Sequence, residues 1–324
     1  MYFVKNNSAE NTPSNMRNKS FYNYFKKRVS KVVYIEDEKK HFFNSKNLLK
    51  GSGQFVFISM PPFSNFWVFF IPNVKVILDI RDGWSIAQNT GYGGIAKPKP
   101  IKAKVTRIIE YILANRACMV ITCTNGLQQY LEEVTKKQVL LIPNGISDED
   151  FQLAEKAKYS ENKEQNNKYV FCCAGQFSEY GEAKVKKICK TIFSRYSSKE
   201  ILIQLIGSSE KENAWVVEYM KDISGGKAFV EILPKKSREE LYKLMADANY
   251  GLVVLRDPSY DFGTKVYDYI ALGLPIVNYF DKPNSFTDYF DMCLDKPFGT
   301  NKQIPEIRRS KLISNVLDVQ EDLQ

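Results

Sequence analysis

The chain has 324 residues, of which 44% are hydrophobic and 26% charged, a profile that is typical of globular proteins and excludes a disordered chain. Its 46 Lys and Arg against 37 Asp and Glu give a formal net charge of +9, which suits nucleic acid, anionic lipid or a phosphorylated substrate. The six cysteines form no C-x-x-C pair and only one histidine accompanies them, so a zinc site is excluded.

The sequence predicts neither a membrane span nor a secreted protein. The most apolar window, residues 55–71, is interrupted by Pro61, Pro62 and Asn65 and cannot supply the roughly 20 apolar residues of a spanning helix. The first residues lack the basic and apolar regions of a secretory signal. We therefore expect a cytoplasmic protein, with peripheral contact to an anionic membrane at the inner face of the plasma membrane. The basic residues form short scattered clusters without a nucleic-acid-binding module, so we expect no nucleic-acid partner.

The first half of the chain alternates apolar strands with helices. A polar loop rich in Asn and Ser is predicted over residues 6–18. The predicted strands are 2–4, 31–35, 55–59, 74–80, 119–122 and 138–142, and the predicted helices are 21–29, 103–117 and 125–134. This alternation is typical of a parallel sheet covered by helices on both faces.

The alternation restarts after a strongly polar stretch, residues 150–168, which we take as the domain boundary. The second half has predicted strands at 169–174, 201–206, 229–233, 251–255 and 275–279, and predicted helices at 183–195, 214–223, 238–248 and 264–272. The expected fold class is α/β, with two Rossmann-like, doubly wound parallel sheets whose ligands bind beyond the carboxyl ends of the strands. The expected domains are residues 1–160 and 161–300, followed by a helical segment, 301–324, that could pack back on the first domain.

The most informative segment is residues 261–277, DFGTKVYDYIALGLPIV, which follows an apolar strand and opens a helix. Thr264 is the predicted N-cap and Gly273 ends the helix. Lys265 and Asp268 are three residues apart, so they share one helix face. A helix start with a lysine can bind a diphosphate, and a carboxylate one turn further can accept hydrogen bonds from a ribose. An ordinary salt bridge between the two side chains is an equally supported alternative.

This segment resembles the donor-binding signature of GT-B glycosyltransferases, especially the family-four group, which reads roughly (S/T)-K-x-x-(E/D)-Y-x-A-x-G-x-P-(I/V). The resemblance implies that Asp268 binds the donor ribose and that Gly263, Thr264 and Lys265 meet the diphosphate. The fuller family signature is a pair of glutamates with seven residues between them. Its first position corresponds to Tyr260, which we therefore add to the donor site, and its second to Asp268.

Three further segments match the same family in the expected order. LDIRDGW at 78–84 resembles a segment of bacterial members that build surface polysaccharides, and IPNGI at 142–146 resembles the segment that closes their N-terminal domain. Gly175 and Gln176 resemble the glycine turn after the first strand of the donor domain, where the backbone can approach the diphosphate. The resemblance thus implies an N-terminal acceptor-binding domain and a C-terminal nucleotide-sugar-binding domain.

The resemblance also asks for cations that stabilise the departing diphosphate. Lys184 is the nearest lysine after the glycine turn, with Lys186 and Lys187 as competitors. Arg256, just past a strand end, is another cation that could reach phosphate. Pro234 follows the strand whose end lies beside the nucleotide base in this family.

Arg81 and Asp82 are the candidate catalytic residues, because they follow a strand and so lie at its carboxyl end, near the predicted cleft. A carboxylate there could act as general base in an inverting reaction. A retaining reaction needs no protein nucleophile, since stabilising the departing diphosphate carries most of the catalysis. A structural ion pair between the two residues is the alternative. Asn15 and Arg17, in the predicted polar loop, are the candidate acceptor-binding residues.

We expect no metal and no cofactor. The acidic run 148–150 superficially matches the D-x-D metal motif of the other glycosyltransferase class, but acidic residues at a helix start are unremarkable. The resemblance implies a metal-independent, retaining, hexosyltransferase-type enzyme. It would move a sugar from a UDP- or GDP-sugar to a saccharide or polyprenyl-diphosphate-linked acceptor in bacterial O-antigen or capsule synthesis. A nucleotide-sugar epimerase on the same fold, which a single histidine fits poorly, and a non-catalytic basic binding protein are the alternatives.

Overall fold

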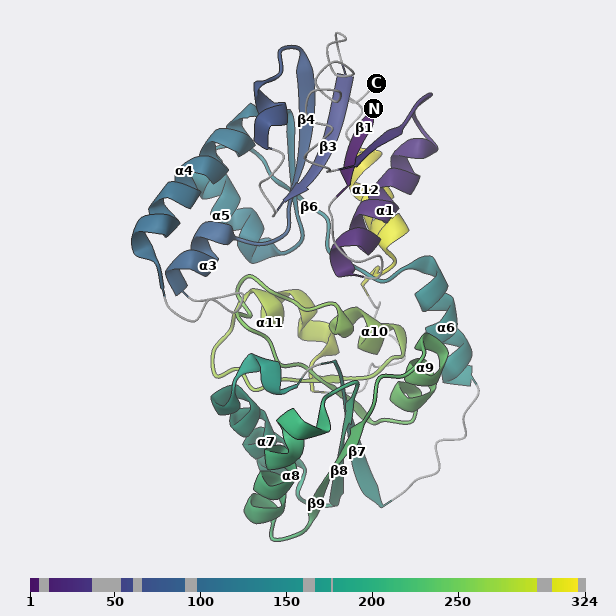
Figure 1. Cartoon of the computed structure of the whole chain (residues 1–324). Helices are drawn as coiled ribbons and strands as arrows, with labels where there is room; N and C mark the ends of the chain where they lie inside the picture. Colours follow the sequence, from purple (N-terminus) through teal and green to yellow (C-terminus); the bar gives the residue numbers. More distant parts are fainter. Residues whose placement is uncertain are drawn as a thin grey trace. The chain divides into compact units, whose positions relative to one another are not determined.

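The computed structural model describes residues 1–5, 12–36, 54–60, 66–90, 98–159, 167–175, 177–295 and 305–319. The chain divides into two compact α/β units (Figure 1). Unit 1 comprises Met1–Ser147, Ser259–Asp261 and Arg309–Gln324, and unit 2 comprises Asp148–Pro258 and Phe262–Arg308. The chain therefore enters unit 2 before the polar stretch of the sequence, and its last segment returns to unit 1.

Unit 1 is built on a six-stranded parallel sheet with the order β2-β1-β3-β4-β5-β6. The strands are β1 (Tyr2–Lys5), β2 (Val33–Glu36), β3 (Gln54–Met60), β4 (Val74–Ile80), β5 (Met119–Thr122) and β6 (Leu140–Leu141). The helices are α1 (Pro13–Lys26), α3 (Trp84–Thr90), α4 (Pro100–Arg116), α5 (Asn125–Thr135) and α12 (Arg309–Leu317), with a 3-10 turn η2 (Phe66–Phe70). Figure 1 shows α3, α4 and α5 on one side of this sheet and α1 with α12 on the other.

The two faces of this sheet carry separate hydrophobic cores because successive side chains of a strand point to opposite faces. Val56, Ile58 and Met60 of β3 pack in the core that includes residues of α4, α5 and η2. Phe57 of the same strand packs in the core formed with α1 and α12, which also contains Ile313. Near-continuous apolar strands thus reflect a sheet that is buried on both faces.

Unit 2 is built on a five-stranded parallel sheet with the order β11-β10-β7-β8-β9. The strands are β7 (Lys168–Ala174), β8 (Glu200–Ile206), β9 (Ala228–Leu233), β10 (Tyr250–Leu252) and β11 (Ile276–Val277). The helices are α6 (Asp148–Tyr159), α7 (Glu182–Tyr196), α8 (Glu210–Ser224), α9 (Arg238–Ala246), α10 (Lys265–Ala271) and α11 (Ser285–Phe290), with 3-10 turns η4 (Ser178–Tyr180) and η5 (Asp291–Cys293). In Figure 1, α7 and α8 lie on one side of this sheet and α6 and α9 on the other.

The first helix differs from the prediction. It spans Pro13–Lys26 and not 21–29, so residues 13–18 are helical and not part of a polar loop. Thr12 is the N-cap, its hydroxyl accepts a 3.4 Å hydrogen bond from the Asn15 amide, and Pro13 follows it at the helix start. Thr-Pro is a helix-start signal in the sequence, because proline needs no amide partner in the first turn. Residues 6–11 of the predicted loop lie outside the described residues.

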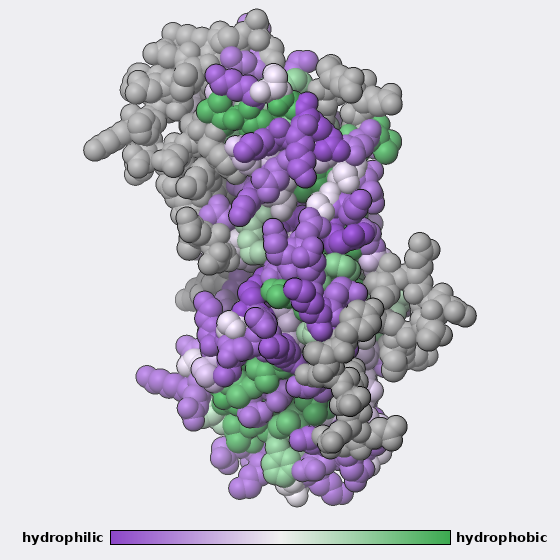
Figure 2. Space-filling model, turned by 90° about the vertical axis from the view of Figure 1, so that its right-hand side faces the viewer, coloured by the Kyte–Doolittle hydropathy of each residue, from purple (hydrophilic) through white to green (hydrophobic). Residues whose placement is uncertain are grey.

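No helix in the described ranges is long and apolar enough to cross a membrane. On the face that Figure 2 shows, hydrophilic side chains cover most of the described surface and hydrophobic ones gather in separate patches.

Candidate functional site

The strand order of unit 2 marks one edge of its sheet as a ligand site. From β7 the chain proceeds to β8 and β9 on one side and later to β10 and β11 on the other. The loops that follow β7 and β10 therefore leave in opposite directions, and ligands of doubly wound sheets bind at such a switch point. Gly175 follows β7 directly, and Arg256 and Gly263 lie in the loop after β10.

Gly175 has a backbone conformation that favours glycine, with φ of 114°. Its amide donates a 2.8 Å hydrogen bond to the Ile206 carbonyl, and its carbonyl accepts one of 2.6 Å from the Ser208 hydroxyl. A Cβ added here would meet nothing within 4 Å, so the glycine serves the turn and leaves space beyond β7. Gln176, the next predicted donor-site residue, lies outside the described residues.

Tyr269 anchors α10 at this edge. Its hydroxyl accepts a 3.0 Å hydrogen bond from the Ala174 amide at the end of β7. Its ring lies over Gly251 of β10, where an added Cβ would come within 2.4 Å of the ring. Complete burial raises the pKa of Tyr269 well above its usual value, so the hydroxyl stays protonated. The tyrosine and glycine together set the position of the neighbouring Asp268.

Asp268 is only 4% exposed, and its carboxylate lies in a network of three helices of unit 2. Its Oδ1 accepts a 2.6 Å hydrogen bond from the Tyr242 hydroxyl of α9. Its Oδ2 lies 3.1 Å from the Lys265 ammonium and 3.9 Å from the Arg238 guanidinium. Arg238 also forms a 2.7 Å ion pair with Asp150 of α6. Burial and the adjacent Asp268 carboxylate raise the pKa of Tyr242, so this tyrosine remains a donor.

The salt bridge between Lys265 and Asp268, the alternative interpretation of this pair, is therefore present. It does not use the whole carboxylate, because Oδ1 is held by a different residue. Thr264 occupies the N-cap position, as predicted, but its side chain makes no capping hydrogen bond. Gly263, at φ of 63°, packs closely on Leu255, whose Cδ2 would lie 3.2 Å from an added Cβ.

Two predicted cations lie at the loop after β10. The Lys184 ammonium donates a 3.0 Å hydrogen bond to the Leu255 carbonyl and another to the Arg256 carbonyl. Arg256 forms an ion pair with Glu179. The competitors point elsewhere, since Lys186 pairs with Glu182 and Lys187 with Asp281. Lys184 is thus the lysine of the three that lies at the switch point.

Two further predicted donor-site residues belong to different units of the chain. Pro234 follows β9 at the carboxyl edge of the unit 2 sheet, where the preceding Leu233 carbonyl accepts a 2.8 Å hydrogen bond from the Gly207 amide. Tyr260 belongs to unit 1, where its carbonyl accepts a 3.3 Å hydrogen bond from the Thr124 hydroxyl. Its ring packs against a small cluster that contains Ile86 and Leu127.

In unit 1, Arg81 and Asp82 follow β4 at the carboxyl end of the sheet. The Arg81 amide donates a 3.0 Å hydrogen bond to the Met60 carbonyl, and its guanidinium donates to the Ser14 hydroxyl at the start of α1. Both side chains are partly exposed, and so is Asn15 in the first turn of α1. The structure therefore brings Arg81 next to α1, the helix that carries both predicted acceptor-binding residues.

Arg17, the other predicted acceptor-binding residue, does not fit that role. Its side chain is 1% exposed and its guanidinium binds both carboxylate oxygens of Asp79, with a shortest distance of 2.8 Å. It also donates a 2.7 Å hydrogen bond to the Ile142 carbonyl. Ser59 donates a 2.9 Å hydrogen bond to the same Asp79 carboxylate. Arg17 thus links α1 to the sheet through buried contacts. We expected it on an accessible loop, but it lies on a helix whose inner face packs against the sheet.

Sequence reasoning missed Asp150, Arg238 and Tyr242. A local signal existed for the last two, because Ser237 and Glu240 form a capping box that starts α9. Arg238 and Tyr242 are then four residues apart and share one helix face. Only the packing of α9 against α6 and α10 shows that this face meets Asp150 and Asp268.

In the described part of the chain, no three His, Cys, Asp or Glu side chains gather closely enough to hold a metal ion. The described cysteines form no disulfide. Burial raises the pKa of Cys173 and of Cys189 to about 12, so both stay thiols.

No protein-family model and no curated protein sequence matches the chain. Solved structures match its fold. HepE from Anabaena in complex with UDP has a TM-score of 0.60 at 12% identity, covering 100% of this chain and 90% of HepE. Sucrose-phosphate synthase from Thermosynechococcus elongatus has a TM-score of 0.56 at 15% identity, covering 90% and 71%. A glycosyltransferase from Rickettsia africae has a TM-score of 0.55 at 14% identity, covering 99% and 96%.

The chain has the GT-B fold. The predicted fold class, with two doubly wound parallel sheets, is thereby confirmed. At these identities the likeness concerns the fold, and the roles of individual residues have to come from the geometry of the chain itself.

Proposed function

We propose that the chain is a glycosyltransferase that binds a nucleotide-sugar donor at the switch point of unit 2. The observation that carries this proposal is the convergence of Gly175, Lys184 and the α10 segment with Asp268 at one edge of a doubly wound sheet. The fold supports it further, since HepE was solved with UDP and also with UDP-glucose, the latter at a TM-score of 0.57 and 12% identity. We take UDP as the first donor nucleotide to test and GDP as the second.

In this proposal Asp268 accepts hydrogen bonds from the donor ribose. Its carboxylate already has one donor, Tyr242, and one cation, Lys265, so ribose hydroxyls would replace or share the Lys265 contact. Lys265, Lys184 and Arg256 would then face the diphosphate. The backbone near Gly175 and Gly263 can approach the phosphates because neither residue has a side chain, and the base would lie at the end of β9, near Pro234.

Catalysis by such a site requires that negative charge on the departing nucleoside diphosphate be stabilised. Preorganised cations at the leaving group supply this without a metal ion, and we propose a metal-independent reaction. We propose retention at the sugar carbon because the α10 segment resembles the donor-binding signature of family-four glycosyltransferases; this route needs no protein nucleophile. Should the reaction invert instead, Asp82 is the candidate base and Arg81 its neighbour at the acceptor.

We place the acceptor at the carboxyl edge of the unit 1 sheet, near Asn15 and Arg81. The proposed acceptor is a saccharide, free or linked to polyprenyl diphosphate, in the synthesis of a bacterial surface glycan. Its hydroxyl oxygen would attack the anomeric carbon of the donor sugar, and the bond from that carbon to the diphosphate would break. In the retaining reaction the hydroxyl proton would pass to the departing diphosphate, which leaves as the nucleoside diphosphate.

The test is thermal unfolding of the protein with UDP, GDP, CMP and dTDP at millimolar concentration. One nucleotide should raise the unfolding midpoint, by an amount that grows with ligand concentration. Asp268→Ala should abolish that rise relative to its own ligand-free midpoint, whereas Asp222→Ala, an exposed carboxylate on α8 of the same unit, should keep it. No rise with any nucleotide, or an equal loss in both variants, would refute the donor site; an unchanged rise in EDTA supports metal independence.

A further inference from the structure

The outward face of α4 in unit 1 carries hydrophobic and basic side chains together. The buried positions of this helix recur every three or four residues, at Ala103, Thr106, Glu110, Leu113 and Ala114, and pack toward the sheet. The opposite face therefore meets solvent. It holds five large hydrophobic side chains with exposed fractions from 39% to 81%, namely Ile101, Val105, Ile108, Tyr111 and Ile112. Half of the exposed large hydrophobic residues in the described ranges thus lie on one helix.

Basic residues interleave with this apolar face. Lys102, Lys104, Arg107 and Arg116 are all exposed on α4. Glu110, the one acidic residue of the helix, is fully buried, where its carboxylate accepts hydrogen bonds from Ser85 and Tyr130. The outward face of α4 therefore carries four positive charges and no negative one.

The face continues onto the 3-10 turn η2. Phe66 and Phe70 are each about half exposed, at 52% and 54%. The Arg116 guanidinium lies 4.6 Å from the centre of the Phe70 ring, and its Nη1 lies 3.4 Å from the Phe69 carbonyl, which accepts its hydrogen bond. We call the exposed hydrophobic and basic residues of α4, with Phe66 and Phe70, the α4–η2 face.

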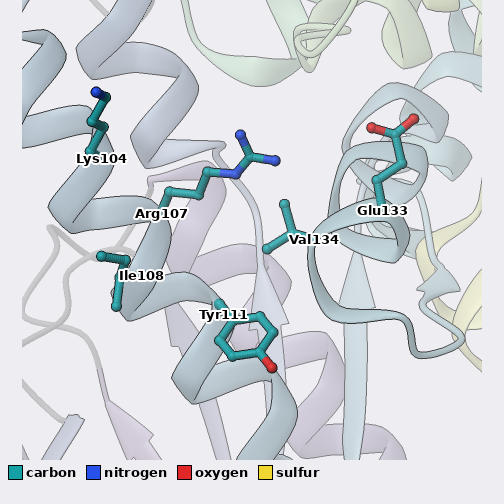
Figure 3. Close-up of a pocket in the computed structure, with 6 residues that line it drawn as sticks. All are labelled: Lys104, Arg107, Ile108, Tyr111, Glu133 and Val134. Carbon is teal, nitrogen blue, oxygen red and sulfur yellow. The ribbon is translucent and has the colours of Figure 1, made fainter.

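A groove of about 450 Å³ borders this face between α4 and α5 (Figure 3). Its α4 side presents Lys104 and Arg107 beside Ile108 and Tyr111, and its α5 side presents Val134 and Glu133. Two cations thus stand next to apolar side chains in one concave site, with one carboxylate across from them.

We propose that the α4–η2 face docks on the surface of an anionic lipid bilayer. Contiguous exposed apolar surface is unusual for a protein that meets only water. Apolar side chains on one helix face can enter the boundary between headgroups and acyl chains, and long basic side chains reach the lipid phosphates. Aromatic side chains such as Tyr111, Phe66 and Phe70 suit the same boundary.

The charge of the face favours a bilayer over a second copy of the chain. A symmetric dimer through this face would set four cations against the same four cations, which repel one another. A bilayer that contains phosphatidylglycerol offers many negative charges and an apolar interior at once. This inference concerns unit 1 and holds whether or not unit 2 binds a nucleotide.

The test is co-sedimentation of the purified chain with two kinds of vesicle, one of phosphatidylcholine alone and one of equimolar phosphatidylcholine and phosphatidylglycerol. We expect binding to the anionic vesicles, weakened by added salt, and little binding to the neutral ones. Lys104→Gln with Arg107→Gln should weaken the binding roughly 25-fold at low salt, from about fivefold for each basic residue at the surface. Val105→Gln with Ile108→Gln should weaken it more than about tenfold, because both side chains would otherwise leave water.

Matched controls lie on unit 2. Lys211→Gln removes an exposed charge from α8, and Phe229→Gln removes an exposed aromatic ring from β9. Neither should change vesicle binding more than about twofold, because neither side chain belongs to the α4–η2 face and a screened charge outside the contact contributes little. Circular dichroism of each variant checks that it folds, and light scattering reports its oligomeric state.

Three results would overturn the inference. The first is no binding of the folded wild type to either vesicle. The second is an equal loss for the α4 variants and the controls, which would show that binding does not depend on the α4–η2 face. The third is a wild-type dimer that the α4 variants split into monomers without vesicle binding, which would assign the face to a second copy.

Discussion

The Tyr242 hydroxyl donates a 2.6 Å hydrogen bond to Asp268 Oδ1 and so joins α9 to α10 in unit 2. Both side chains are buried, Tyr242 at 1% exposure and Asp268 at 4%. A buried carboxylate needs such a donor, because desolvation without a partner is costly. Tyr242 therefore positions the residue that we assign to the donor ribose, without being assigned a contact with the donor itself.

Tyr242→Phe should destabilise the protein by about 1–3 kcal/mol, since it leaves Oδ1 of a buried carboxylate without this donor. It should also weaken nucleotide binding, because the Asp268 carboxylate is held less firmly. Urea unfolding and the nucleotide-dependent thermal shift measure the two effects.

Tyr219→Phe is the matched control on α8 of the same unit. The Tyr219 hydroxyl is buried without a hydrogen-bond partner among the described residues, so its removal should cost nothing measurable. An equal loss of stability in the two phenylalanine variants would contradict the role of the Tyr242 hydrogen bond.

Gly251→Ala should lower stability through crowding. The new methyl group would lie 2.4 Å from the Tyr269 ring, a contact that must displace the tyrosine and with it α10. Overpacking of this kind costs about 1–3 kcal/mol. Combining it with Tyr269→Ala should make the glycine substitution nearly neutral in that background, as judged by urea unfolding. If Gly251→Ala lowers the free energy of unfolding equally with and without the Tyr269 ring, the ring is not the reason why position 251 requires glycine.

Arg17→Met should strongly destabilise unit 1, by about 3–5 kcal/mol, because it leaves the buried Asp79 carboxylate without its cation. Arg17→Met combined with Asp79→Leu should recover much of that loss. A double-mutant cycle in urea measures the coupling between the two side chains. Additive losses would refute the pairing, and a folded Arg17→Met protein that loses only acceptor affinity would restore the acceptor role that we have set aside.

Glu110 should make stability depend on pH. Burial raises the pKa of this carboxyl above 4.5, against the hydrogen bonds from Ser85 and Tyr130 that lower it. The folded state then binds the proton more tightly than the unfolded state, so stability falls as pH rises from the unfolded pKa to the folded one and stays reduced above it. Glu110→Gln should lack this pH dependence. The free energy of unfolding of the variant minus that of the wild type should therefore increase as pH rises through that window. A pH-independent difference would show that Glu110 titrates as in the unfolded chain.

The pattern of the sequence was sufficient for the fold class and for the order of the strands, but it did not predict the helices α3, α6 and α11. Parallel strands that are buried on both faces are nearly continuous apolar runs, and glycine and proline mark the turns between elements. Both patterns can be recognised within a short stretch of sequence. The α10 segment was found in the same way, since Gly273 and the spacing of Lys265 and Asp268 are properties of one helix. Thr12 and Pro13 mark the start of α1 in the sequence as well, although the polar composition of residues 6–18 indicated a loop.

Only the tertiary structure decided what each polar side chain meets. Arg17 and Arg81 look alike in a sequence, yet one is sealed against Asp79 and the other reaches the partly exposed Ser14. Tyr242 contacts Asp268 across 26 residues, and the basic, apolar face of α4 is apparent only when Glu110 is seen to be buried. Burial and long-range pairing depend on how helices pack on a sheet, and the periodicity of a single element does not contain that information.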